Sequence, residues 1–251
     1  MRLKRQLADL LEYTLDARVV RRGTLPTLVE QEHLTRFFEH FEIDCVFDVG
    51  ANAGQYADMI RTRCGYKGPV ISFEPVPDLA NSLRKRANPT WFIEQTVLNE
   101  IAGPVDFNVA ADSQFSSMNR PAGHKLFEQP SATVQTIKIP ASTLADQFDK
   151  YLKLIGFKRP FLKMDTQGSD LAVARSAGNR LQRFVGIQSE LSFDPIYKGI
   201  PTAMEALNFY QSNGFALIAF VPNNTGHFPH LFEIDCILYR VCPPSPHGSI
   251  V

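Results

Sequence analysis

Residues 44–74 constrain the fold more than any other part of the sequence. Residues 45–49 are a short apolar run rich in β-forming types, and residues 50–54, which follow, are all small. Helical spacing then runs over residues 55–63, and a second apolar run, residues 69–73, ends at an acid. Strands that are apolar on both faces are typical of a parallel sheet. The stretch therefore predicts a βαβ unit whose tight turn and final acid meet at the edge where such sheets bind ligands.

The turn after the first strand departs from the loop that binds dinucleotides. That loop has the pattern Gly-x-Gly-x-x-Gly so that the backbone can approach a diphosphate. Aligning it on Gly50 puts Asn52 and Gln55 at the second and third glycine positions. Glu74, at the end of the second strand, is placed to accept hydrogen bonds from both ribose hydroxyls. A ribose-binding acid without a diphosphate cradle favours S-adenosylmethionine (SAM), which carries adenosine and no phosphate, over NAD.

Four stretches carry a resemblance to a known family. They are residues 46–56, residues 73–75 (Phe-Glu-Pro), residues 161–168 (Phe-Leu-Lys-Met-Asp-Thr-Gln-Gly) and residues 187–192, with Tyr197 and Gly199 after the last. The third is similar to an LKIDVEG segment and the fourth to a Q-x-E-x-S stretch. Together, and in this order, they resemble the motifs of the FkbM family of SAM-dependent methyltransferases. The resemblance runs over about residues 46–240 and implies methyl transfer from SAM.

The remaining pattern predicts a doubly wound α/β fold with a mostly parallel, Rossmann-like sheet of seven strands, as in class I methyltransferases. Strands are expected at residues 91–97, 105–109, 133–139, 161–164, 184–189, 215–221 and 232–240, and helices at residues 77–86, 169–177 and 201–213. No helix separates the last two strands, so we expect an antiparallel hairpin at one edge. The predicted organisation is an N-terminal helical extension (1–42), a methyltransferase domain (43–242) and a flexible tail (243–251).

Composition excludes several classes of partner. The chain has 251 residues, 44% of them hydrophobic, and 26 basic residues balance 26 acidic ones, so no net charge attracts nucleic acid. Residues 193–197 are similar to the Asp-Pro-Pro-Tyr box of enzymes that methylate bases, but they lack the second proline and follow the fifth strand.

No apolar run is long enough to span a membrane. The four cysteines lack metal-site spacing, and reduced thiols in a cytoplasmic protein are expected.

Two helices are expected before the first strand, at residues 2–18 and 29–40. The first has a leucine stripe with basic residues on its other faces. Packing on the domain, capping the active site or forming a homodimer is favoured over binding at a membrane surface, because acidic residues dilute its positive charge.

The cofactor site is predicted from the ends of the first strands and from the resemblance. The candidate SAM-binding residues are Asp48, Gly50, Asn52, Gly54, Gln55, Glu74, Pro75, Asn99 and Asp165. Asn99 lies at the edge where methyltransferases of this class approach adenine, although a surface turn explains it equally well.

Three residues are candidates for the catalytic base. Asp165 and Glu190 end the fourth and fifth strands of the sheet, and His124 lies in the long polar loop 110–132, which resembles the family's substrate-side insertion. Helix capping is the alternative role for Asp165, and a surface carboxylate the alternative for Glu190. Asp165, Asp170 and Glu190 also form a candidate Mg²⁺ site, with a solvated acidic rim as the alternative.

The resemblance implies that the acceptor is a hydroxyl of a carbohydrate or secondary metabolite. The predicted activity is therefore SAM-dependent O-methyl transfer to a small-molecule or glycan hydroxyl. Two alternatives remain, a non-catalytic module that binds SAM or a nucleoside, and an NAD-dependent oxidoreductase. Ser169, Gln167 and Asp170 depart from the family's usual residues, which leaves the identity of the base open.

Overall fold

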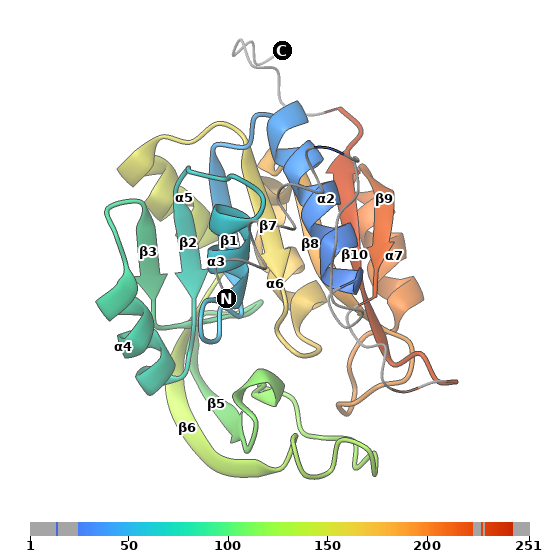
Figure 1. Ribbon diagram of the computed structural model, residues 1–251. Helices are drawn as coiled ribbons and strands as arrows, with labels where there is room; N and C mark the ends of the chain where they lie inside the picture. The colour runs from blue at the N-terminus through green and yellow to red at the C-terminus, as the bar shows by residue number, and fades with distance from the viewer. Residues whose placement is uncertain (1–13, 15–24, 223–226, 228, 243–251) are drawn as a thin grey trace.

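The computed structural model describes residues 14, 25–222, 227 and 229–242 (Figure 1). Its α-helices are α2 (Leu25–His40), α3 (Gln55–Thr62), α4 (Pro77–Arg86), α5 (Leu144–Ile155), α6 (Asp170–Ser176) and α7 (Ala203–Ser212). Its strands are β1 (Cys45–Val49), β2 (Val70–Phe73), β3 (Trp91–Glu94), β4 (Val97–Leu98), β5 (Gly103–Ala110), β6 (Thr133–Ser142), β7 (Pro160–Met164), β8 (Gly186–Ser192), β9 (Phe215–Val221) and β10 (Glu233–Arg240). Two 3₁₀ helices, η2 (Ser113–Phe115) and η3 (Gly178–Arg183), complete the described elements.

The main sheet has seven strands in the order β3-β2-β1-β7-β8-β10-β9. The first five in this order are parallel, and β10 is antiparallel to both β8 and β9. The predicted doubly wound sheet and its antiparallel hairpin are confirmed. Strand β10 lies inside the sheet, between β8 and β9. Its acidic residues therefore lie beside the end of β8, at the edge of the sheet that carries the site.

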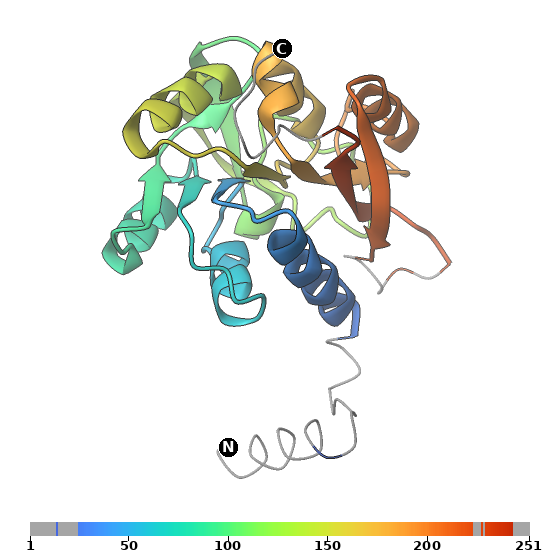
Figure 2. The same cartoon turned by 90° about the horizontal axis from the view of Figure 1, so that it is seen from above.

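Helices cover the main sheet on both faces (Figure 2). Among the described helices, α2, α3 and α4 lie on one face and α5, α6 and α7 on the other. Phe37 and Phe38 of α2 meet the ring of Phe161 edge-on, at centroid distances of 5.1 and 5.2 Å. A Cβ at Gly186 would lie 2.2 Å from the ring of Phe37, so a larger residue there would displace α2. Helix α2 is thus held firmly on the face that carries the site.

A second sheet, in the order β4-β6-β5, lies across the carboxyl ends of the first strands (Figure 1). The predicted strand at residues 91–97 is divided, because β3 pairs with β2 in the main sheet whereas β4 pairs with β6. Helix α5, between β6 and β7, was not predicted. Its signals are in the sequence, since Thr143 accepts a hydrogen bond from the N–H of Asp146 as an N-cap and Gly156 ends the helix at φ 69°.

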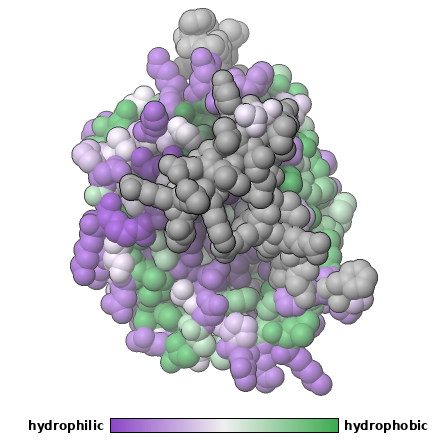
Figure 3. Space-filling model, in the orientation of Figure 1, coloured by the Kyte–Doolittle hydropathy of each residue, from purple (hydrophilic) through white to green (hydrophobic). Residues whose placement is uncertain are grey.

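The described residues leave some predictions open. The predicted helix 2–18 with its homodimer contact, and the tail 243–251, lie outside them apart from Thr14. No helix within the described part of the chain is long and apolar enough to cross a membrane. The visible described surface has hydrophilic and hydrophobic residues interspersed (Figure 3). Cys45 and Cys236 are buried free thiols, as the sequence predicts.

Candidate active site

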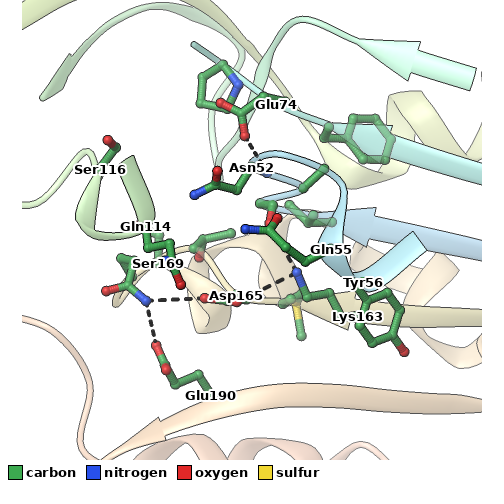
Figure 4. A pocket seen from close by; sticks show the side chains of 18 of the residues that line it. Asn52, Gln55, Tyr56, Glu74, Gln114, Ser116, Lys163, Asp165, Ser169 and Glu190 are labelled. Carbon is green, nitrogen blue, oxygen red and sulfur yellow. Dashed lines mark hydrogen bonds and ion pairs between the residues drawn. The ribbon is translucent and has the colours of Figure 1, made fainter. Parts of the chain in front are cut away.

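A cavity of about 540 Å³ opens at the carboxyl ends of β1, β2, β7 and β8. The start of β10 and the first turns of α2 border one end, and β5 and η2 border the other side. Figure 4 shows Glu74 at one end, Asp165 and Lys163 near the middle and Glu190 at the other end. Of the predicted cofactor residues, those that line it are Gly50, Asn52, Gln55, Glu74, Pro75 and Asp165.

The turn after β1 brings two strand ends into close contact. Gly50 has φ 77°, and a Cβ there would lie 1.9 Å from the carbonyl oxygen of Asp165. Only glycine allows this approach. Gly54 also has a positive φ, but a Cβ there would lie 2.7 Å from Leu83 and 3.0 Å from Trp91, and Gly54 is not among the cavity-lining residues. Gly54 therefore serves the packing of α4 and β3, whereas Gly50 shapes the cavity.

Glu74 is a buried carboxylate that the backbone already supports. Its side chain accepts hydrogen bonds from the N–H groups of Asn52 (2.7 Å) and Val76 (2.8 Å) and is 4% exposed. Burial raises the pKa of Glu74 to about 7, although the two N–H donors oppose the rise. Each carboxylate oxygen keeps a further acceptor position, so Glu74 can take hydrogen bonds from a ligand that carries two neighbouring hydroxyls.

Asp48, a predicted cofactor ligand, lies beneath the cavity floor. It is fully buried and does not line the cavity. Its carboxylate is 3.1 Å from Nζ of Lys163 and accepts a hydrogen bond from Ser72 at 2.9 Å. Burial alone would lower the pKa of Lys163, but Asp48 and Asp165 outweigh it and the pKa is raised. Lys163 also donates to the carbonyl of Gly50 at 3.1 Å, so this ion pair fixes the turn from below.

Asp165 and Glu190 lie together, as the ends of adjacent strands require. The side-chain amide of Gln167 joins them, because its Nε2 is 3.2 Å from Asp165 and 3.1 Å from Glu190. Tyr197 donates to the other end of this amide, Oε1, at 3.0 Å. Gln167 has φ 55°, an uncommon backbone conformation for a residue with a side chain. The bridge therefore holds two candidate catalytic carboxylates on one side of the cavity.

Two other predicted site residues do not reach the cavity wall. His124 packs edge-on against Phe232 and lies 3.8 Å from the half-buried Asp194. Asn99 donates its backbone N–H to the carbonyl of Ser142, and its neighbours Thr96 to Leu98 line the cavity instead. The predicted loop 110–132 does reach the site, through residues 113–116 and Met118.

Asp170 has a structural role that conflicts with binding a metal. Its buried carboxylate accepts hydrogen bonds from the N–H and hydroxyl of Thr166, the hydroxyl of Ser189 and the N–H of Glu190. With these four donors it closes the start of α6 against β8. Within the described residues, no group of three or more His, Cys, Asp or Glu side chains is arranged to hold a metal. The Mg²⁺ prediction therefore has no support from the site.

Several cavity residues were not predicted. They are Glu30, Tyr56, Lys163, Gln167, Gln188, Glu233 and Asp235. For β10 the signal is in the sequence, because Glu233 and Asp235 alternate with apolar residues at the start of an expected strand and must share one face. Glu30 carries no such signal, because it reaches the cavity only through the packing of α2.

The residues present fit SAM and do not fit a dinucleotide. The volume lies within the range of about 300–1,000 Å³ usual for small-molecule sites. The second glycine position of a dinucleotide loop is held by Asn52, whose side chain accepts a hydrogen bond from Ser113 at 3.2 Å. The turn therefore lacks the second glycine that lets the backbone approach a diphosphate. Glu74 offers the carboxylate that a ribose requires.

No curated protein matches the chain significantly. Similar solved structures include a SAM-dependent methyltransferase from Aquifex aeolicus, with 13% identity over 86% of this chain and 98% of that one, at a TM-score of 0.40. Another is the magnesium protoporphyrin IX methyltransferase of Synechocystis with bound SAM, with 8% identity over 94% and 96% and a TM-score of 0.44. Fibrillarin of Aeropyrum pernix with bound SAM has 11% identity over 78% and 66%, at 0.42.

The comparison with family models identifies one family. The model of the methyltransferase FkbM domain matches residues 48–217. This range contains the turn at Gly50, Glu74 and the Asp165–Gln167–Glu190 bridge, and it makes up more than half of the 251 residues. The chain therefore belongs to the FkbM family of SAM-dependent methyltransferases.

Proposed function

We propose that the protein transfers a methyl group from SAM to a hydroxyl of a carbohydrate or secondary-metabolite acceptor. One observation supports the proposal most directly. A single cavity contains Glu74, the carboxylate placed to bind ribose, and the paired carboxylates Asp165 and Glu190 (Figure 4). A hydroxyl is a weak nucleophile unless a base removes its proton, and a carboxylate in the same cavity as SAM suits that need.

Each residue then has a defined task. SAM, when bound, supplies the methyl group on its sulfonium sulfur and leaves as S-adenosylhomocysteine. Glu74 accepts hydrogen bonds from the ribose hydroxyls, and Gly50 lets the turn after β1 approach Asp165 closely. Asp165 accepts the proton of the acceptor hydroxyl, while Glu190 accepts a hydrogen bond from the acceptor and orients it. The Gln167 amide keeps the two carboxylates at a fixed separation, and such positioning is a main source of rate in a displacement reaction.

Variants of the two carboxylates test the proposal. Asp165→Asn removes the base with little change in shape, so kcat should fall by roughly 10²–10⁴-fold while SAM affinity changes little. The rate is measured as the formation of S-adenosylhomocysteine from SAM in the presence of glycan or polyol acceptors, and calorimetry gives the affinity. Asp149→Asn, at an exposed site on α5, is a matched control.

Three results would count against the proposal. Full activity of Asp165→Asn would remove Asp165 as the base. A methyl group located on nitrogen or carbon of the product would contradict transfer to oxygen. SAM binding without turnover of any hydroxyl acceptor would favour a non-catalytic binding module.

A further inference from the structure

One end of the cavity, beside α2, carries carboxylates that the proposed methyl transfer leaves without a task. Glu30 reaches it from α2, and Glu233 and Asp235 reach it from β10. In the antiparallel register Asp235 lies directly opposite Glu190. Residues two apart on a strand point to the same face, so Glu233 joins them on that face. These four residues, Glu30, Glu190, Glu233 and Asp235, are called the acidic end below.

The charge of the cavity is unbalanced. Its described lining contains six carboxylates, namely Glu30, Glu74, Asp165, Glu190, Glu233 and Asp235. Lys163 is the only Lys, Arg or His among the described residues that line it, and its Nζ already contacts Asp48 and Gly50. SAM carries a sulfonium and an ammonium against one carboxylate, hence a single net positive charge. Among the described residues and the cofactor, there is therefore less positive charge than these carboxylates would carry if all of them were ionised.

Two buried polar groups beside the acidic end have no hydrogen-bond partner among the residues that the structure describes. Gln188 is 3% exposed; its Nε2 donates to Glu30 at 2.8 Å, but its Oε1 has no donor among the described residues. Tyr56 is 8% exposed, and its hydroxyl likewise has no partner in the described part of the chain. Buried polar atoms nearly always have a partner, so both point to a ligand. Because Gln188 Oε1 and the carboxylates accept, the ligand must bring donors.

We propose that the methyl acceptor carries a protonated amine, as an amino sugar or another amino alcohol does, and that the acidic end binds its ammonium group. The proposal rests on the proposed function, because it assigns a substrate class to the same cavity. An ammonium has three donors and no acceptor, which matches a wall made of carboxylates and one amide oxygen. Hydrogen bonds between charged partners are also the stronger kind. The hydroxyl of the acceptor then lies toward Asp165.

The protonation of the acidic end supports this assignment. Burial, with Asp165 and Asp170 adding to it, raises the pKa of Glu233 to about 8. Burial and neighbouring carboxylates also raise the pKa of Glu190 and of Asp235. The charged or titratable groups that act on these residues are Glu30 on α2, Lys163 on β7, Asp165 directly after β7, and Asp170 on α6. A bound ammonium favours the ionised carboxylates, so amine binding should release protons.

The experiment compares two probes that differ at one nitrogen. Glucosamine and N-acetylglucosamine are titrated separately into the full chain saturated with S-adenosylhomocysteine, and binding is followed by calorimetry near pH 7. Glucosamine should bind at least roughly tenfold more tightly, because only it carries a charge for the acidic end. The double variant Glu233→Gln, Asp235→Asn should remove that difference, whereas Glu39→Gln, at an exposed position of α2, should preserve it. Repeating the titration in two buffers of different ionisation enthalpy should show proton release with glucosamine only.

The possible results separate this proposal from the proposed function. Equal binding of the two probes, or no binding of either, overturns the amine proposal. A double variant that loses S-adenosylhomocysteine affinity as strongly as glucosamine affinity also overturns it, because the acidic end would then bind the amino-acid ammonium of the cofactor. If the wild-type chain does not bind S-adenosylhomocysteine at all, the proposed function itself fails.

Discussion

The two ends of the cavity hold their carboxylates with different kinds of hydrogen-bond donor. At the cofactor end, Glu74 is buried but receives two backbone N–H groups, and its surroundings include the apolar residues Phe73 and Leu98. At the acidic end, Glu190 lies opposite Asp235. The donors at the acidic end are side chains, since Gln167 donates to Glu190 and Gln188 donates to Glu30. The carboxylate at the cofactor end is therefore held by the backbone itself, whereas those at the acidic end are held through other side chains.

Lys163 lies where the two ends meet, and changing it should have the largest effect. Lys163→Met leaves the fully buried Asp48 without its cation, and the expected loss in free energy of unfolding is about 3–5 kcal/mol. Urea denaturation measures it. The double variant Asp48→Leu, Lys163→Met removes both charges and should regain much of that loss. If the single variant loses less than about 1 kcal/mol, the ion pair does not support the turn as described.

Glu74 tests the claim that the cofactor end is complete. Glu74→Ala removes the acceptor for the ribose hydroxyls and also for the N–H groups of Asn52 and Val76. SAM affinity should fall by roughly 100-fold or more, since hydrogen bonds to charged groups contribute about 1.5–3 kcal/mol each. Calorimetry checks this, with Glu39→Ala as the control. Wild-type affinity in Glu74→Ala would reject the ribose role.

The pH dependence of stability, a smaller effect, tests the acidic end. The pKa of Glu233 in the folded chain, about 8, lies above its ordinary value of 4.5, so the folded chain holds a proton that the unfolded chain releases. This contribution is fully present below about pH 4.5 and is lost as the pH rises through about 8. The melting temperature of the ligand-free protein should therefore decline between about pH 5 and 8, and less steeply in Glu233→Gln. A melting temperature that rises across this window in the wild type, with no change in Glu233→Gln, would contradict the description.

The sequence predicts the cofactor end better than the acidic end, for a physical reason. The turn at Gly50 and the acid Glu74 belong to one βαβ unit, so their spacing along the chain places them together. The sheet and its edge hairpin follow from the same alternation of apolar runs. Asp48 shows where this reasoning is incomplete, because a residue on the correct strand points below the floor toward Lys163.

The acidic end is assembled from parts that are distant in sequence. Glu30 precedes the first strand, and Glu233 and Asp235 begin the last, so they meet only because β10 inserts between β8 and β9 and α2 packs across the sheet. The spacing of these residues along the chain does not predict that they lie together. His124 was predicted from residue type within a loop, and the loop reaches the cavity through residues 113–116 and Met118 instead.

A crystal structure of the protein with S-adenosylhomocysteine tests the central claim most directly, namely that one cavity holds the cofactor at Glu74 and leaves the acidic end for the acceptor. The expected map shows the ribose hydroxyls hydrogen-bonded to Glu74, the sulfur directed toward Asp165, and open space beside Glu190, Glu233 and Asp235. A ligand whose ribose lies against the acidic end, or one bound outside this cavity, would contradict the account.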